Sequence, residues 1–228
     1  MTKVLYLHGF ASGPQSKKAV YFASQLSQAG IDCAVPDLNQ PDFFSMTLSH
    51  QISTALSCAQ KLNAKKLVLI GSSMGGLLAT ILAEQYLDVS ALILLAPGFG
   101  ITSRWPLFLG SADALATWQK NGSRNFMHYA LGREAPLSYE FVRDLEKHPL
   151  AMSRPEEIKL KNRALIFHGI DDQTVPYDNS AAVQSNNPGV ELIKLEDNHE
   201  LVTSLPQIWQ KSRQTIAPET VLKENLPL

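Results

Sequence analysis

One stretch of the sequence decides the fold: Lys66-Leu67-Val68-Leu69-Ile70-Gly71-Ser72-Ser73-Met74-Gly75-Gly76-Leu77-Leu78. An apolar, strand-like run ends at Gly71, and a helix-forming run begins just after Ser73. The Gly-x-Ser-x-Gly pattern between them predicts a strained strand-to-helix turn that lifts the Ser73 hydroxyl above the edge of a sheet. Glycine is expected at 71 and 75 because a Cβ at Gly71 or Gly75 would collide with a neighbouring strand or helix. An ordinary loop is the alternative, since a five-residue match also arises by chance.

The bulk properties describe a globular chain with room for one sizeable core. Its 228 residues suit one α/β domain, with or without an insertion. Apolar content of 45% and charged content of 18% are globular values, and a net charge of −1 does not suggest nucleic acid or an anionic membrane as a partner. Cys33 and Cys58 sit in apolar runs, which is typical of reduced core cysteines in a cytoplasmic protein. No apolar run approaches the ~20 residues that span a bilayer, and no leader segment is expected.

Strand-like and helix-like segments alternate over most of the chain. Short apolar runs bounded by turn residues predict strands at 4–7, 31–35, 67–70, 91–95, 164–167 and 190–195. Apolar residues at helical spacing and stop signals predict helices at 16–29, 45–62, 74–86, 179–185 and 205–216. This alternation predicts a mainly parallel sheet of about six strands with helices on both faces.

The alternation stops between residues 99 and 160, where no strand is expected. The stretch is too long for a bare loop, and its pieces resemble helices at 111–119, 123–131 and 138–147. Large apolar side chains concentrate there: Trp105, Phe108, Trp118, Phe126, Met127, Tyr129 and Phe141. We therefore predict a core of residues 1–98 and 161–217, an inserted helical cap of residues 99–160, and a loosely held tail of residues 218–228. A helical extension packed on the side of the sheet is the alternative.

Residues with chemical potential follow the predicted strands at their carboxyl ends, where sites in parallel α/β sheets lie. Ser73 follows the third strand, Asp171 and Asp172 follow the fifth, and His199 follows the last. A hydroxyl nucleophile needs a base, and the base needs an acceptor that fixes its tautomer. The order Ser, Asp, His is expected for a hydrolase with this sheet. The sequence therefore predicts Ser73 as nucleophile, His199 as base and one of the two aspartates as acid.

An acyl-transfer reaction also needs hydrogen-bond donors for the developing oxyanion. The backbone amide of Met74, at the N-terminus of the helix after the turn, is one natural donor. The second should come from the loop after the first strand, where the Phe10 amide is best placed.

Each of these residues also has a less specific interpretation. His199 could be a surface-loop histidine, and Asp171 and Asp172 could be turn formers. Ser72 could in principle be the nucleophile, and Asp37, at another strand end, is a minor candidate for the lining of the site. Two further histidines, His8 and His168, are interpreted as structural residues that are hydrogen-bonded at strand ends.

The sequence resembles the α/β-hydrolase superfamily in four segments: Leu7-His8-Gly9-Phe10, Gly71-Ser72-Ser73-Met74-Gly75-Gly76, His168-Gly169-Ile170-Asp171-Asp172-Gln173-Thr174-Val175-Pro176 and Asp197-Asn198-His199. More narrowly, Tyr6-Leu7-His8-Gly9-Phe10 followed by Ser12-Gly13-Pro14 and Ser16-Lys17-Lys18-Ala19 is similar to small bacterial esterases of the YqiA type. The doubled serine also resembles related acyl-thioesterases. The superfamily pattern implies that Asp172, not Asp171, is the triad acid. The sequence departs from the superfamily pattern in two places. It begins with the His-Gly strand, which implies a minimal sheet without an antiparallel edge. Asn198 replaces the glycine that usually precedes the triad histidine.

These features predict a serine hydrolase that cleaves a carboxylic ester or thioester through an acyl-enzyme on Ser73. The aromatic-rich cap predicts a small-molecule substrate with an apolar acyl group. No cofactor, metal ion, nucleic acid or membrane is expected as a partner, and a homodimer is left open. Two alternatives remain because fold and triad do not fix chemistry. One is a non-hydrolytic enzyme on this fold, such as a lyase or a cofactor-free peroxidase, and the other is a non-catalytic binding protein on the same scaffold.

Overall fold

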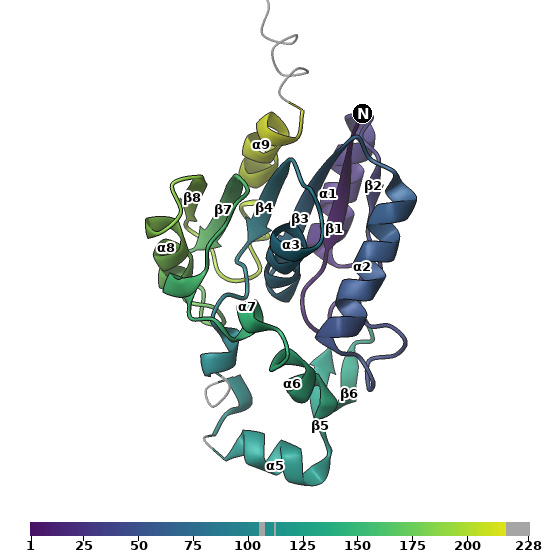
Figure 1. The fold of residues 1–228 in the computed structure, drawn as a ribbon, viewed down its shortest axis with the longest axis vertical. Coiled ribbons are helices and arrows are strands. Elements are labelled where there is room, and N and C mark those ends of the chain that lie inside the picture. The colour runs from purple at the N-terminus through teal and green to yellow at the C-terminus, as the bar shows by residue number, and fades with distance from the viewer. Residues whose placement is uncertain (105–107, 112, 218–228) are drawn as a thin grey trace, which may run out of the picture.

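The computed structural model describes residues 1–104, 108–111 and 113–217. Its centre is a six-stranded sheet with the order β2-β1-β3-β4-β7-β8, in which every pair of neighbours is parallel (Figure 1). The strands are β1 (Thr2–Leu7), β2 (Cys33–Ala34), β3 (Lys66–Ser72), β4 (Ala91–Leu95), β7 (Ala164–Gly169) and β8 (Val190–Leu195). The prediction of a minimal parallel sheet of six strands is therefore confirmed.

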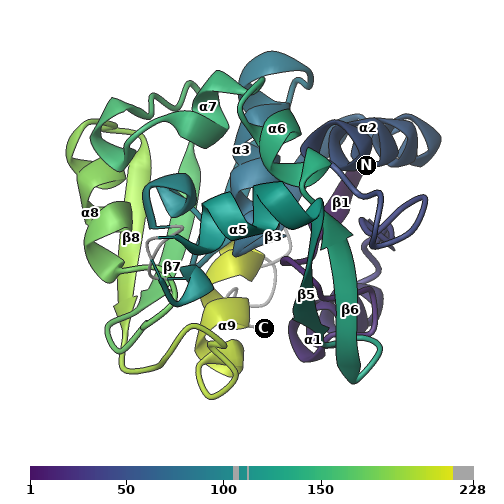
Figure 2. The ribbon, with the colours of Figure 1, turned by 90° about the horizontal axis from the view of Figure 1, so that it is seen from below.

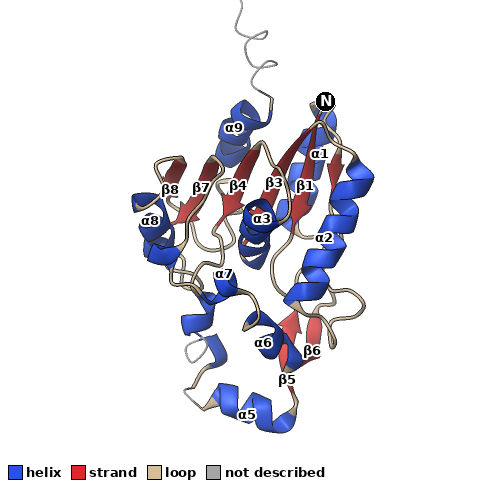
Figure 3. Cartoon of the chain, in the orientation of Figure 1, coloured by secondary structure: helices blue, strands red, loops and turns tan. Residues whose placement is uncertain are grey.

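Helices cover both faces of this sheet (Figure 3). They are α1 (Lys17–Gln28), α2 (Leu48–Leu62), α3 (Met74–Gln85), α8 (Tyr177–Ser185) and α9 (Leu205–Ile216). Alternate residues of a strand point to opposite faces, so Leu5 and Leu7 pack in the core beneath α2 and α3, while Tyr6 packs with Phe22 of α1 and Ile208 of α9. Because both faces are covered, the strands are apolar almost throughout.

Two predicted elements are shorter in the structure than in the sequence pattern. The second strand has only Cys33 and Ala34 in ladder pairing, because it lies at the edge of the sheet and contacts β1 alone. The second helix begins at Leu48 rather than at 45, because the Thr47 side chain accepts a hydrogen bond from the His50 amide and caps the helix there.

The segment predicted as a purely helical cap also contains a β-hairpin, which corrects the prediction of a helix at 123–131. Strand β5 (Ser123–His128) pairs antiparallel with β6 (Arg133–Ser138), with Phe126 opposite Ala135. Gly132, interpreted as a helix stop, has a φ of +64° and lies in the turn between the strands. The number of apolar residues in 123–131 is compatible with a helix, but Phe, Met and Tyr are equally common in a half-buried hairpin.

The remaining regular structure of this segment is helical within the described residues. Its helices are η1 (Ile101–Arg104), α5 (Ala114–Asn121), α6 (Glu140–Leu145), α7 (Pro149–Met152) and η2 (Pro155–Glu157). Figure 2, which looks at the carboxyl ends of the strands, shows α5, α6 and the hairpin lying across that end of the sheet. Trp105 and the predicted tail, residues 218–228, lie outside the described residues.

Polar contacts fasten the cap to the core. Asp144 of α6 accepts hydrogen bonds from the Ser49 amide (2.7 Å) and the Ser49 hydroxyl (2.9 Å) at the start of α2. His148 Nε2 lies 3.0 Å from the same hydroxyl. Burial opposes ionisation of Asp144, but the bonds from Ser49 outweigh it and hold the pKa of this carboxyl below its usual value. The carboxylate contacts the serine directly and lies 3.6 Å from His148 Nε2, the nitrogen that faces the serine, rather than on Nδ1, so this cluster is an anchor and not a second triad.

Across residues 1–104, 108–111 and 113–217, every helix is too short or too polar to cross a lipid bilayer. Cys33 and Cys58 are free thiols and partly buried.

Candidate active site

Ser73 lies at a sharp turn between β3 and α3, as the Gly-x-Ser-x-Gly pattern predicts. Its φ of +52° and ψ of −118° are unusual for a residue with a side chain, which is the strain expected of such a turn. A Cβ on Gly75 would come within 2.1 Å of the Leu7 carbonyl oxygen, and one on Gly71 within 2.3 Å of the Gly75 carbonyl oxygen. Both glycines are therefore required by the close approach of β1, β3 and α3.

We expect Gly75→Ala to lower the free energy of unfolding by roughly 4 kcal/mol or more, because backbone rather than a movable side chain blocks the new methyl group. Gly189→Ala is the matched control, since the nearest atom to its Cβ, the Asn162 carbonyl oxygen, is 3.9 Å away. Urea titrations of both variants measure the difference. Equal midpoints for the two variants would contradict the account of the turn.

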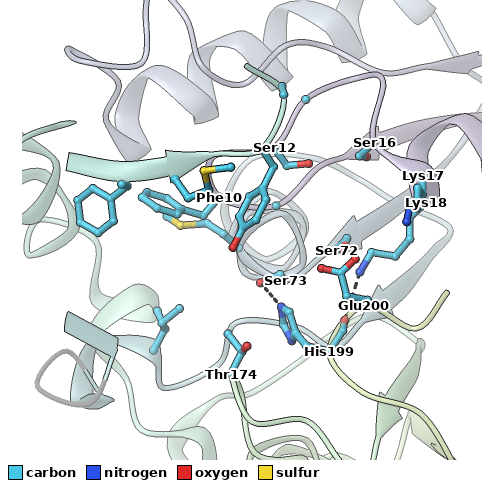
Figure 4. A pocket seen from close by; sticks show the side chains of 18 of the residues that line it. Phe10, Ser12, Ser16, Lys17, Lys18, Ser72, Ser73, Thr174, His199 and Glu200 are labelled. Atoms are coloured by element: carbon cyan, nitrogen blue, oxygen red, sulfur yellow. Dashed lines mark hydrogen bonds between the residues drawn. The ribbon is translucent and has the colours of Figure 1, made fainter. Parts of the chain in front are cut away.

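The three residues predicted as a triad meet at the carboxyl edge of the sheet. Ser73 Oγ lies 3.0 Å from His199 Nε2, and His199 Nδ1 lies 2.7 Å from Asp172 Oδ2 (Figure 4 shows the Ser73–His199 bond). Asp172 comes from the turn after β7 and His199 from the loop after β8. Because an ionised carboxylate only accepts hydrogen bonds, Nδ1 carries the imidazole proton, and Nε2 is left to accept from the serine hydroxyl.

The Asp172 carboxylate has hydrogen-bond donors on both oxygens. Oδ1 accepts from the Thr174 and Val175 amides, each at 2.8 Å, and Oδ2 accepts from His199 and from His168 Nε2 at 3.1 Å. Burial alone would raise the pKa of this carboxyl, but the bonds from His168 and His199 outweigh it and hold the pKa well below its usual value. Asp172 is therefore ionised and fixed in orientation at neutral pH.

His168 and His8 have the structural contacts expected of them. His168 Nε2 also lies 2.9 Å from the Val175 carbonyl oxygen, and Nδ1 lies 2.7 Å from the Ser180 hydroxyl. His8 Nε2 accepts a hydrogen bond from the Leu38 amide. The sequence did not reveal that His168 donates to the same oxygen as His199. The spacing of four residues between His168 and Asp172 was the available signal.

The two amides predicted as oxyanion donors belong to segments that lie close to Ser73. Phe10 follows Gly9, whose Cβ position would be 3.4 Å from the Ser73 Cβ, and Met74 is the first residue of α3. Within the part of the chain that the structure describes, neither amide has a hydrogen-bond acceptor. Both amides are therefore free to donate a hydrogen bond, as an oxyanion hole requires.

The alternative candidates from the sequence, Ser72, Asp171 and Asp37, have no hydrogen bond to His199 among the described residues. Ser72 is 3% exposed and has no bond to His199, so the geometry favours Ser73 as the reactive hydroxyl. Asp171 lies in the wall of the cavity and does not contact His199. Asp37 Oδ1 accepts a hydrogen bond from the Asn39 amide and lies 3.7 Å from His8 Nε2. Asp37 does not line the cavity.

A cavity of about 860 Å³ lies over Ser73, with walls of two kinds. One side is apolar and formed mainly by the cap: Phe10, Ile101, Phe108, Phe126, Met127 and Phe141. The other side is polar and includes Ser16, Lys18, Thr174 and Glu200. Figure 4 shows Phe10 and Lys18 on opposite sides of Ser73. The hydroxyl therefore faces a cavity in which an apolar group and a polar group can be held on either side of a reacting carbon.

Lys18 is a site residue to which the sequence gave no role. Its side chain lies against the His199 loop, although it occurs in the Ser16-Lys17-Lys18-Ala19 segment that carries the narrower resemblance. Among the described residues, no cluster of three or more His, Cys, Asp or Glu side chains could hold a metal ion.

Several solved structures have a fold similar to that of this chain. Among solved structures, the chain is similar to a putative hydrolase from Agrobacterium vitis S4, with 21% identity and a TM-score of 0.77 over 94% of this chain and 88% of that chain. It is similar to Est1E from Butyrivibrio proteoclasticus bound to ferulic acid, with 22% identity and a TM-score of 0.72 over 95% and 90% of the two chains. Mouse alpha/beta hydrolase domain-containing protein 10 is 19% identical, with a TM-score of 0.74 over 95% and 90%.

These likenesses show that the chain has the α/β-hydrolase fold. No curated protein matches it. The model of one protein family, described as the uncharacterised protein family UPF0227, matches residues 3–213. That match covers nearly the whole chain, and the protein therefore belongs to the UPF0227 family, with the fold of the α/β-hydrolase superfamily.

Proposed function

We propose that this protein is a serine hydrolase that cleaves a carboxylic ester or thioester through an acyl-enzyme on Ser73. The observation that carries the proposal is the unbroken hydrogen-bond chain from Ser73 through His199 to Asp172, with spacings of 3.0 and 2.7 Å. The unpaired Phe10 and Met74 amides support it. Further support comes from structures of similar fold that are described as an esterase and as lipolytic enzymes.

In the proposed reaction, Ser73 Oγ attacks the acyl carbon while His199 Nε2 takes the hydroxyl proton. The carbonyl oxygen becomes negative and accepts hydrogen bonds from the Phe10 and Met74 amides. His199 then gives the proton to the leaving alcohol or thiol, and the acyl-enzyme forms. Water, deprotonated by the same imidazole, releases the acid in the second half. Asp172 accepts the hydrogen bond from His199 Nδ1–H throughout and stabilises the imidazolium.

The apolar side of the cavity is the proposed acyl compartment. The Phe10 ring packs edge-on to Phe126 at 5.3 Å between centroids, and lies 5.6 Å from Phe141 and 6.3 Å from Phe108. These rings form a continuous wall beside Ser73, and the Arg124 guanidinium, 6.0 Å from the centre of the Phe126 ring, does not line the cavity. A hydrocarbon acyl group of short or medium length would be desolvated there, whereas a charged one would lose its hydration without a partner.

The proposal is tested with p-nitrophenyl esters and alkyl thioesters that share a series of acyl groups from acetyl to decanoyl. We expect kcat/KM to rise by about fourfold per added methylene until the compartment is full. If Ser73 reacts with a fluorophosphonate but the protein hydrolyses none of these substrates, a lyase or peroxidase is favoured. If Ser73 does not react with the fluorophosphonate and the protein binds a ligand without converting it, the non-catalytic binding protein is favoured. Comparison of the two leaving groups assigns the ester or thioester preference.

Phe126→Ala should weaken the selectivity for longer acyl groups. We expect kcat/KM for the hexanoate ester to fall by about 10- to 100-fold, with a much smaller change for the acetate ester, because only the longer chain reaches this ring. Phe44→Ala is the matched control, since Phe44 is 49% exposed and does not line the cavity. The chain-length profiles of the two variants and the parent make the comparison. An unchanged profile in the Phe126 variant would place the acyl group elsewhere.

A further inference from the structure

Lys18 connects the first helix to the loop that carries His199. Its Nζ donates a hydrogen bond to the His199 carbonyl oxygen at 3.2 Å, across 181 positions of the sequence (Figure 4). No carboxylate lies within ion-pair distance of Nζ among the described residues. The direct partner of this ammonium is therefore the backbone of the residue predicted as the base, rather than an acidic side chain.

The surroundings of Lys18 are partly buried and rich in carboxylates. Burial lowers the pKa of the Lys18 ammonium to about 8, while the charges of Glu200, Asp172 and Asp197 act in the opposite direction. Those three carboxylates belong to the loops after β7 and β8, and Lys17, the neighbour on α1 itself, is exposed. Lys18 therefore remains mostly charged at pH 7.

The loop after β8 is held at several other points but has few bonds to His199 itself. Asp197 Oδ2 accepts from the amide and hydroxyl of Ser204, at 3.0 and 2.9 Å. Asn198 Oδ1 accepts from the Glu200 amide at 2.9 Å. Leu201 then has a φ of +53°, a strained value for a leucine. Asp172 fixes the His199 ring and Lys18 fixes its backbone, so the two contacts together determine where Nε2 lies.

We propose that Lys18 is a positioning residue for His199, which holds the backbone of the base in register with Ser73. The inference rests on the proposed function of Ser73 and His199. It adds that the first helix, through one side chain, sets the placement of the base.

The test compares Lys18→Met, which removes donor and charge, with Lys18→Arg, which keeps both. We expect Lys18→Met to lower kcat by about 10- to 100-fold with little change in KM, because a small displacement of the base impairs the chemical step. Lys18→Arg should retain most of kcat, because its guanidinium can still donate to the His199 carbonyl oxygen. Lys61→Met, on the exposed surface of α2, controls for loss of one positive charge.

A second readout does not depend on turnover. The His199 ring signals, assigned by comparison with a His199→Gln variant, are recorded by NMR at one pH, and their chemical shifts should change in Lys18→Met and stay close to the parental values in Lys18→Arg. If the parent hydrolyses no ester yet the ring signals change as expected, the proposed function fails and the role of Lys18 stands. Unchanged ring signals with parental kcat overturn the inference. Equal losses of kcat in both variants with unchanged ring signals also overturn it, because they indicate a structural role alone.

Discussion

Replacing Ser73 with alanine is expected to lower kcat/KM for a preferred ester by about 10⁴-fold or more, to the level that binding and the oxyanion donors alone can supply. The structure gives the reason, because Ser73 Oγ is the hydroxyl within hydrogen-bond distance of His199 Nε2. The strained backbone at this position is unchanged by loss of one oxygen atom. The variant should therefore remain folded, with a melting temperature close to that of the parent.

Ser72→Ala is the matched control for this experiment. The two serines are adjacent in the sequence, but Ser72 is the last residue of β3 and is buried without a bond to the imidazole. We expect it to keep the larger part of the activity. Steady-state kinetics on both purified variants measure the contrast, and full activity in the Ser73 variant with loss in the Ser72 variant would reverse the assignment of the nucleophile.

Asp172→Asn is expected to lower kcat by about 10⁴-fold, because the amide forces the wrong tautomer on His199. The amides of Thr174 and Val175 both donate to Oδ1 and will hold the amide oxygen of asparagine in that place. Its NH₂ group then faces His199 Nδ1, which must accept. The imidazole proton is then on Nε2, so Nε2 can no longer accept the proton of the Ser73 hydroxyl.

The neighbouring Asp171→Asn variant separates this effect from a general loss of charge. Asp171 is exposed and has no contact with the imidazole, so its variant should keep kcat within about threefold of the parent. Rates at saturating substrate over pH 6–9 (roughly the range in which histidine bases operate) measure both. Equal losses in the two variants would show that Asp172 acts through charge alone.

The sheet and the meeting of Ser73, Asp172 and His199 at its edge could be predicted because their signals are local in the sequence. Buried parallel strands are short apolar runs that end at turn residues, and each predicted site residue follows such a run directly. The glycines of the turn at Ser73 were predictable for the same reason, since a tight turn leaves no room for a Cβ at Gly71 or Gly75. Ser73, Asp172 and His199 then meet because the carboxyl ends of parallel strands lie at one edge.

The cap was predicted less well because its structure depends on contacts between distant residues. The strand at 123–128 is stabilised by pairing with β6 and by contacts to the core, such as the bond from the Tyr129 amide to the Ala11 carbonyl oxygen. Its apolar spacing alone does not exclude a helix. Lys18 was missed on the same grounds, since its bond to His199 joins residues 181 positions apart.

The most direct test of the account is to identify the residue that reacts with a fluorophosphonate, which transfers its phosphonyl group to an activated serine hydroxyl and releases fluoride. After reaction to completion, the intact mass and the modified peptide are determined by mass spectrometry. We predict one phosphonyl group per chain, on Ser73, and strongly slowed labelling in His199→Ala. Absence of labelling in the folded parent, or labelling of Ser72 or another residue in place of Ser73, would contradict the account.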